Sequence, residues 1–398
     1  MKAIQVKNGV YWVGALNPDL RIFDVIMETK SGTTYNSYLV RGENKTALFE
    51  VVKDGFENEL IERISSVIDP EAIDYIIFDH TEPDHSGSIK NVLQKMPKAQ
   101  VLGSQAAITF LSQILNTDFN KRIVKHGEEL DLGGKTLRFF STPFLHWPDT
   151  MMTYLPEDKI LFSCDAFGSH FCNQEIFDNL VGDFSEEFKV YYDAIIYPFS
   201  KYVLQAASKI KDLEIDIICP SHGPILRQDP WSYINTYVDW SIREMEEGPK
   251  NVIVIYTSNY GYTARLAKEI VLGLANGGVK VEVMDILEHS KADLRKKIDL
   301  ADGLLIGSPT FNRDAIPPIW ELLAEVSAII NKDKPASAFG SYGWSGEAVK
   351  YMEQRLQQLQ FKITQPGLRV NFVPNADNLE EARNFGREFA AVVGANKS

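Results

Sequence analysis

The chain has 398 residues, of which 44% are hydrophobic, and a formal net charge of −13. This length predicts two or three domains, and the acidic balance argues against nucleic acid or an anionic membrane as the main partner. Its three cysteines form no CxxC pair, and no apolar run reaches the length of a membrane span. A cytoplasmic protein without a disulfide framework or an iron–sulfur site is therefore expected.

The first part of the chain predicts β structure over residues 1 to about 54, including one strand at Phe23–Met27. A helix is expected over 55–67, strands at 75–78 and 100–103, helices from Ile89 and over 104–115, and a hairpin over 129–141 that turns at Gly133 and Gly134. This order favours an α/β sandwich with mixed sheets over a Rossmann unit.

Four side chains that can bind a metal follow the strand at 75–78: His80, Glu82, Asp84 and His85. Alternate residues of an extended segment share a face, so His80, Glu82 and Asp84 are expected on one side and His85 on the other. A single His-x-Glu pair would be an ordinary loop feature, and Asp84 alone would suit a helix N-cap. The density of ligands after a buried strand instead favours a loop that serves two adjacent metal ions.

Three more polar residues follow apolar β runs in the same way: His146, Asp165 and His222. Taken singly, each is as consistent with a capped turn or a hydrogen-bonded loop histidine as with a ligand. The repetition of one arrangement favours a shared metal site.

A long helix is expected over 186–211, split by Pro198, and another over 230–246. Tyr197 is a candidate for a hydrogen bond near the metals. The polar stop with Gly and Pro after the second helix predicts a domain boundary, with domains at 1–249 and 250–398.

The second domain opens with a strand at 251–256 and a helix from Ala264. The loop between them offers hydroxyls, an amide and a glycine at a helix N-terminus, where free backbone amides bind phosphate. No GxxxxGK pattern is present, which excludes a nucleoside triphosphate loop and favours flavin mononucleotide (FMN). The phosphate-binding residues expected are Ser258, Asn259, Tyr260, Gly261, Tyr262 and Thr263.

Strands at 279–284, 303–307 and 336–340 and helices from Pro317, over 345–359 and over 378–394 then predict a doubly wound sheet. Such sheets bind ligands at the carboxyl ends of their strands. Two loops there are expected to hold the flavin, with Tyr342 and Trp344 offering aromatic faces to its ring. Their residues are Ser308, Pro309, Thr310 and Asn312, and Ser341, Tyr342, Gly343, Trp344, Ser345 and Gly346.

The pattern His80-x-Glu82-x-Asp84-His85, followed by His146, Asp165 and His222, resembles the metallo-β-lactamase superfamily. That resemblance implies an αββα sandwich in which His80, Glu82 and His146 bind one metal, Asp84, His85 and His222 bind the other, and Asp165 bridges them. Glu82 replaces the usual second histidine, and a harder oxygen donor favours iron or manganese over zinc. His126, His170 and His289 match no motif position and are expected to be ordinary loop or surface residues.

The run from Val254 to Ala267 looks like the flavodoxin signature, and a lactamase-like domain followed by a flavodoxin-like domain resembles the flavodiiron proteins, or A-type flavoproteins. The resemblance implies two iron ions, FMN, and the reduction of nitric oxide to nitrous oxide, of dioxygen to water, or both. It further implies an external electron donor such as rubredoxin, and a head-to-tail homodimer or dimer of dimers. Trp147, beside His146, is a candidate for lining the gap between flavin and metals.

Two other classes fit parts of the sequence. A dizinc hydrolase with a flavodoxin-like appendage would purify with zinc and act without a reductant, and Glu82 argues against it. An electron carrier with a docking module at its N-terminus would have no need of seven ligands in register.

Overall fold

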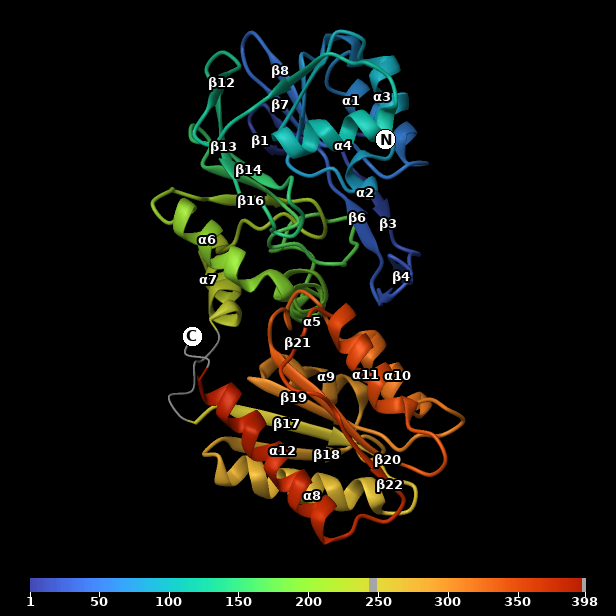
Figure 1. The fold of residues 1–398 in the computed structure, drawn as a ribbon. Helices are drawn as coiled ribbons and strands as arrows, with labels where there is room; N and C mark the ends of the chain where they lie inside the picture. The colour runs from blue at the N-terminus through green and yellow to red at the C-terminus, as the bar shows by residue number, and fades with distance from the viewer. Residues whose placement is uncertain (243–248, 396–398) are drawn as a thin grey trace. The chain divides into compact units, whose positions relative to one another are not determined.

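The computed structural model describes residues 1–242 and 249–395, and the chain divides into two compact units, Met1–Arg243 and Glu244–Ser398 (Figure 1). The end of the helix expected over 230–246 lies partly outside the described residues. The domain boundary expected after residue 249 lies next to the undescribed residues 243–248, and it stays a prediction. Within the described part of the chain, no helix is long and apolar enough to cross a bilayer.

Two mixed sheets form the centre of the first unit. The seven-stranded sheet has, in spatial order, β1 (Ile4–Lys7), β2 (Val10–Trp12), β7 (Tyr38–Arg41), β8 (Thr46–Phe49), β9 (Tyr75–Phe78), β10 (Gln100–Gly103) and β11 (Lys121–Ile123). The five-stranded sheet has β12 (Glu129–Asp131), β13 (Thr136–Ser141), β14 (Met151–Leu155), β15 (Ile160–Cys164) and β16 (Ile217–Pro220). The expected hairpin over 129–141 is confirmed, with Gly133 and Gly134 at φ +83° and +70°.

Helices cover the outer faces of both sheets, so the expected αββα sandwich is confirmed. The seven-stranded sheet packs against α1 (Glu57–Ser65), α3 (Ile89–Lys95) and α4 (Gln105–Leu115). The five-stranded sheet packs against α5 (Ser185–Tyr191), α6 (Ser200–Ile210) and α7 (Pro230–Ser241). Apolar side chains fill the space between the sheets, where the Phe49 and Phe162 rings stack with centroids 4.0 Å apart. The central strands β8, β9, β15 and β16 are buried on both faces and are mainly apolar, whereas β11 and β12 at the sheet edges carry charged, exposed residues.

Two local expectations for this unit meet different outcomes. The strand expected at Phe23–Met27 is wrong: β4 (Ile22–Phe23) and β5 (Met27–Glu28) pair across a turn, in which Asp24 and Val25 take positive φ. The apolar composition suggested one strand, but its two end residues, Phe23 and Met27, pair with each other across the turn. The split at Pro198 is confirmed, because η2 (Tyr192–Ile196) and η3 (Tyr197–Phe199) separate α5 from α6.

A parallel sheet with helices on both faces forms the second unit, as expected. Its strand order is β18 (Lys280–Asp285), β17 (Asn251–Tyr256), β19 (Gly303–Gly307) and β20 (Pro335–Tyr342), followed by β21 (Lys362–Ile363) and β22 (Leu368–Asn371), which both pair with β20. One face carries α8 (Tyr262–Asn276) and α12 (Ala376–Ala395), which lie side by side in Figure 1. The other carries α9 (Lys291–Leu300), α10 (Pro317–Glu325) and α11 (Glu347–Gln358).

Close packing of α8 against α12 depends on glycine. A Cβ at Gly386 would lie 2.2 Å from the Ile270 carbonyl oxygen, whereas a Cβ at Gly394, in the same helix, would meet nothing within 4 Å. Gly386→Ala should therefore lower the free energy of unfolding by about 1–3 kcal/mol through overpacking.

Gly394→Ala is the matched control, and its higher helix propensity should stabilise the protein by at most about 1 kcal/mol. Calorimetric unfolding of the full chain measures both variants. Equal effects at the two positions would contradict close helix packing.

Candidate functional site

Four connections that follow strands bring the candidate metal ligands together. His80 and Glu82 follow β9, and α2 (Pro83–Ser86) carries Asp84 and His85. The remaining three ligands lie in the β13–β14 connection, just after β15, and just after β16: His146, Asp165 and His222. Ligand atoms within 4.8 Å of one another form two groups, the first made of His80, Glu82, His146 and Asp165, the second of Asp84, His85 and His222.

The expectation that Asp84 shares a face with His80 and Glu82 is wrong. Proline suits the first position of a helix, and Pro83 opens α2 there, with the Gly87 amide donating to the Pro83 carbonyl at 2.7 Å. The backbone therefore turns after Glu82 instead of continuing extended. Asp84 and His85 consequently face the second group together.

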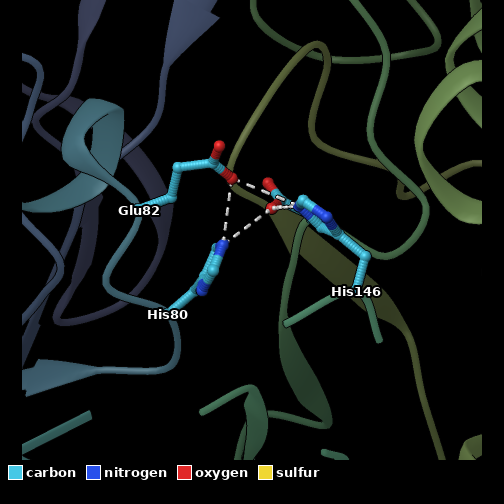
Figure 2. A group of neighbouring side chains, drawn as sticks. His80, Glu82 and His146 are labelled. Carbon is cyan, nitrogen blue, oxygen red and sulfur yellow. Dashed lines mark hydrogen bonds and ion pairs between the residues drawn. The ribbon is translucent and has the colours of Figure 1, made fainter. Parts of the chain in front are cut away.

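In the first group, three side chains converge on one point (Figure 2). Glu82 Oε2 lies 3.2 Å from His80 Nε2 and 3.3 Å from His146 Nε2. Asp165 Oδ2 lies 3.1 Å from His146 Nε2 and 3.6 Å from His80 Nε2. Two imidazole nitrogens and two carboxylate oxygens thus surround a single position.

The second group also combines imidazole nitrogens with carboxylate oxygens, and Asp165 connects it to the first group. Asp84 Oδ2 lies 2.9 Å from His222 Nε2, and Asp84 Oδ1 lies 3.4 Å from His85 Nε2. Asp165 Oδ1 lies 3.2 Å from His85 Nε2 and 3.5 Å from His222 Nε2. The two oxygens of Asp165 therefore face different groups, as a bridging carboxylate requires.

A further layer of residues orients three of the imidazoles through Nδ1. His80 Nδ1 lies 3.2 Å from Asp149 Oδ2, and His85 Nδ1 lies 3.0 Å from Glu50 Oε2. His222 Nδ1 donates to the Thr34 carbonyl oxygen at 2.6 Å. Partners of this kind fix the tautomer that leaves Nε2 free for a metal. Sequence reasoning missed Asp149 and Glu50, and only the position of Asp149, three residues after His146, signals a role.

Burial and charge set the protonation of these groups. Burial by itself lowers the pKa of His80, but hydrogen bonds to Asp149 and Glu82 outweigh it and raise that pKa to about 10. Burial likewise works to raise the pKa of Asp165, but His85 and His146 hold it well below its usual range. Without a metal, protons on the imidazoles thus neutralise the carboxylates.

The donor set fits metal ions better than protons. Asp84 Oδ1, Asp165 Oδ1 and His85 Nε2 are buried and have no hydrogen-bond partner among the described residues. Buried polar atoms without partners are rare and costly, and metal coordination would satisfy all three. Carboxylates mixed with imidazoles suit iron.

His170 lies in a loop, one of the two alternatives expected for it, but it is buried and not at the surface. Its ring centroid lies 5.4 Å from that of His222, and burial, together with the charge of His222, lowers the pKa of His170 to about 3. Trp147 packs edge-on against His80, with centroids 5.1 Å apart. Tyr197 lies in η3, with its ring 6.4 Å from that of Tyr192.

In the second unit, the loop after β17 has the form of a phosphate-binding loop. Gly261 caps α8 at φ +79°, and the helix begins at Tyr262, two residues before the expected start, so that Tyr262 and Thr263 lie in its first turn. The Ser258 hydroxyl is buried and has no hydrogen-bond partner in the described part of the chain. Free amides of a helix N-terminus beside an unpaired hydroxyl fit a phosphate monoester.

The two other loops meet this one at the same end of the sheet. The Thr263 and Ser341 hydroxyls are 2.8 Å apart, and the Thr310 amide donates to the Ser341 carbonyl oxygen at 3.0 Å. Strand β20 extends through Tyr342, so Ser341 and Tyr342 end the strand and do not belong to a loop as expected. Trp344 is largely exposed, and its ring is available to a planar ligand.

Comparison with known proteins agrees with both units. The profile of the "ODP family beta lactamase" family matches residues 33–223, and that of flavodoxin matches residues 254–386. The flavo-diiron protein FprA2 of Clostridium acetobutylicum is 43% identical over 99% of this chain and 100% of its own length. The nitric oxide reductase of Moorella thermoacetica is 36% identical over 98% of each chain. The solved structure of rubredoxin oxygen:oxidoreductase from Desulfovibrio gigas matches with a TM-score of 0.71 and 29% identity, over 99% of both chains.

Fold, ligand groups and relatives define a flavoprotein oxidoreductase with a lactamase-like metal domain. More particularly, the chain belongs to the flavo-diiron protein family.

Removing the charge beside His80 should weaken metal binding. Asp149→Asn keeps the shape of the side chain but loses the carboxylate that orients the ring, and such changes lower metal affinity by about 10- to 100-fold. Chelator competition on metal-free protein measures the affinity for Fe(II). Asp118→Asn, at a side chain that is 94% exposed, is the control and should bind like the wild type; an equal affinity in Asp149→Asn would contradict the orienting role.

Metal binding should release protons. The pKa of His80 is about 10 without metal, so its imidazole is protonated at neutral pH and must lose that proton to bind a cation. The affinity for Fe(II) should rise as the pH increases from about 6.5 towards that pKa, by about tenfold per pH unit for each proton displaced. Titration of Fe(II) into weakly buffered metal-free protein measures the protons released, and an affinity independent of pH would refute the charge assignment.

Proposed function

We propose that this chain reduces nitric oxide to nitrous oxide, dioxygen to water, or both, at two iron ions that receive electrons through FMN. One observation carries the proposal: the Asp165 carboxylate lies between two adjacent ligand groups, in a chain that also holds a flavodoxin unit. A site for two metals in the same chain as a carrier of electrons suits multi-electron reduction better than hydrolysis. The names of the relatives from Moorella thermoacetica and Desulfovibrio gigas support both gases as substrates.

Each ligand group would hold one iron ion. His80, Glu82 and His146 would bind the first, Asp84, His85 and His222 the second, and Asp165 both. When bound, the iron pair supplies the electrons and the position at which the gas reacts. Through their contacts with the imidazoles, Asp149 and Glu50 hold the ligands in register, and burial of the cluster keeps bulk water away from it.

The FMN phosphate would lie at the N-terminus of α8, against Ser258 to Thr263. Its ring would lie against the residues that follow β19 and end β20, with Tyr342 and Trp344 as aromatic contacts. When bound, the flavin stores two electrons. Two electrons with two protons convert two nitric oxide molecules to nitrous oxide and water, and four electrons with four protons convert dioxygen to two waters.

The finer features of the proposal follow the family. The electron donor would be rubredoxin or a similar small redox protein, and the working form a head-to-tail homodimer or dimer of dimers in the cytoplasm. Support for the donor comes from the anaerobic nitric oxide reductase flavorubredoxin of Aeromonas hydrophila, which is 35% identical over 98% of this chain and 79% of its own length. Trp147 would line the gap between flavin and metals, and the rate of electron transfer across that gap tests its role.

Metal identity and gas consumption together test the function. Protein purified without oxygen should contain two iron ions and one FMN per chain, and should consume one or both gases when supplied with reduced rubredoxin. Glu82→His restores the second histidine of the usual motif and gives the first group three imidazoles, which suits zinc. It should lower the iron content and the rate by about 10- to 100-fold while the FMN content stays unchanged.

Separate assays with each gas at matched reductant identify the substrate. Wild-type protein that carries stoichiometric zinc and hydrolyses esters without a reductant would overturn the proposal in favour of a dizinc hydrolase.

A further inference from the structure

A cavity of about 190 Å³ lies between β5 and α5 in the first unit, outside the two ligand groups. Residues from both elements line it, together with His170 from the connection after β15. The lining includes Met27, His170, Glu187, Val190, Tyr191 and Ala194.

The deepest lining residues leave two polar atoms without partners. His170 is 6% exposed and Tyr191 is 1% exposed, and their ring centroids lie 4.9 Å apart. His170 Nδ1 pairs with the Thr33 hydroxyl at 3.0 Å, but neither His170 Nε2 nor the Tyr191 hydroxyl has a hydrogen-bond partner among the described residues. Buried polar atoms are nearly always hydrogen-bonded, and this cavity is large enough for water or another small molecule. The floor therefore offers two hydrogen-bonding atoms to an occupant.

The same floor adjoins the second ligand group. The ring centroid of His222 lies 5.4 Å from that of His170 and 6.1 Å from that of Tyr191. One layer of side chains thus separates the cavity from His222, whose Nε2 faces Asp84.

The rim repels anions, and the apolar part of the lining disfavours ions of either sign. Glu28, Glu186 and Glu187 lie at the rim with one cation, Lys30, which pairs with Glu186 at 2.5 Å. An excess of carboxylates repels small anions. Met27, Val190 and Ala194 add apolar surface at the mouth, which disfavours an ion more than a neutral molecule.

We propose that this cavity is the access chamber through which a small neutral diatomic gas reaches the metal centre from the side of His222. Water bonded to His170 and Tyr191 occupies the floor at rest, and the gas passes over or displaces it. The inference rests on the proposed function, since it assigns a route to the substrate of that reaction.

Filling the mouth should slow access without touching a ligand. Ala194→Trp and, separately, Val190→Trp place an indole in the lining. Both should lower kcat/KM for the gas several-fold, while kcat at saturating gas, iron content and FMN content stay at wild-type values. Ser208→Trp, at an exposed position of α6 away from the cavity, is the matched control and should leave kcat/KM unchanged.

Xenon provides a readout that needs no turnover. Crystals of the holoenzyme under xenon should show an atom in the cavity of the wild type and of Ser208→Trp, and none in Ala194→Trp. An empty wild-type cavity, or unchanged kcat/KM in both plugged variants, would overturn the access route alone. A wild-type holoenzyme that consumes neither gas would instead overturn the proposed function, whatever the xenon result.

Discussion

The position of one buried carboxylate, Asp165, governs the arrangement of the first unit. Its two oxygens face different ligand groups, so every other ligand has to be placed relative to it. The sheet achieves much of this directly, because β15 and β16 are parallel neighbours, with Cys164 opposite Pro220. Asp165 and His222 then follow adjacent strand ends. A carboxylate at this depth is costly to bury unless opposite charges or hydrogen bonds surround it, and the neighbouring imidazoles meet that need.

Sequence reasoning succeeded where a local rule determines the outcome. Each ligand follows an apolar β run, and carboxyl ends of buried strands gather at sheet edges, so the convergence of His80, His146 and His222 could be expected from the sequence. It failed where the backbone changed its local form. Glu82 is extended but Pro83 starts a helical turn, and the face assigned to Asp84 changed with it. The apolar run at Phe23–Met27 likewise became a hairpin, because nothing in the run itself reveals which residues will find a pairing partner.

The residues that orient the ligands could not be predicted, since their contacts arise from packing between distant segments. Asp149 meets His80 across 69 positions of sequence, and Glu50 meets His85 from the end of a different strand. His170 shows the same limit, since a histidine outside every motif gives no sign that it will be buried beside His222. In the second unit the limit matters less. The phosphate-type loop is contiguous in sequence, and the sheet order changes direction at β17 and β19, where such folds bind their ligand.

The pattern of protonation links folding of the first unit to its chemistry. Hydrogen bonds and charge raise the pKa values of all four ligand histidines against the effect of burial, and lower those of Glu82, Asp84 and Asp165. Protons thereby take the place of metal charge while the cluster is buried, so the carboxylates do not have to repel one another in a metal-free chain. A divalent ion then exchanges for protons at atoms that already point at the right position. The site therefore needs little rearrangement on metal binding, and the free energy of coordination is not spent on ordering the ligands.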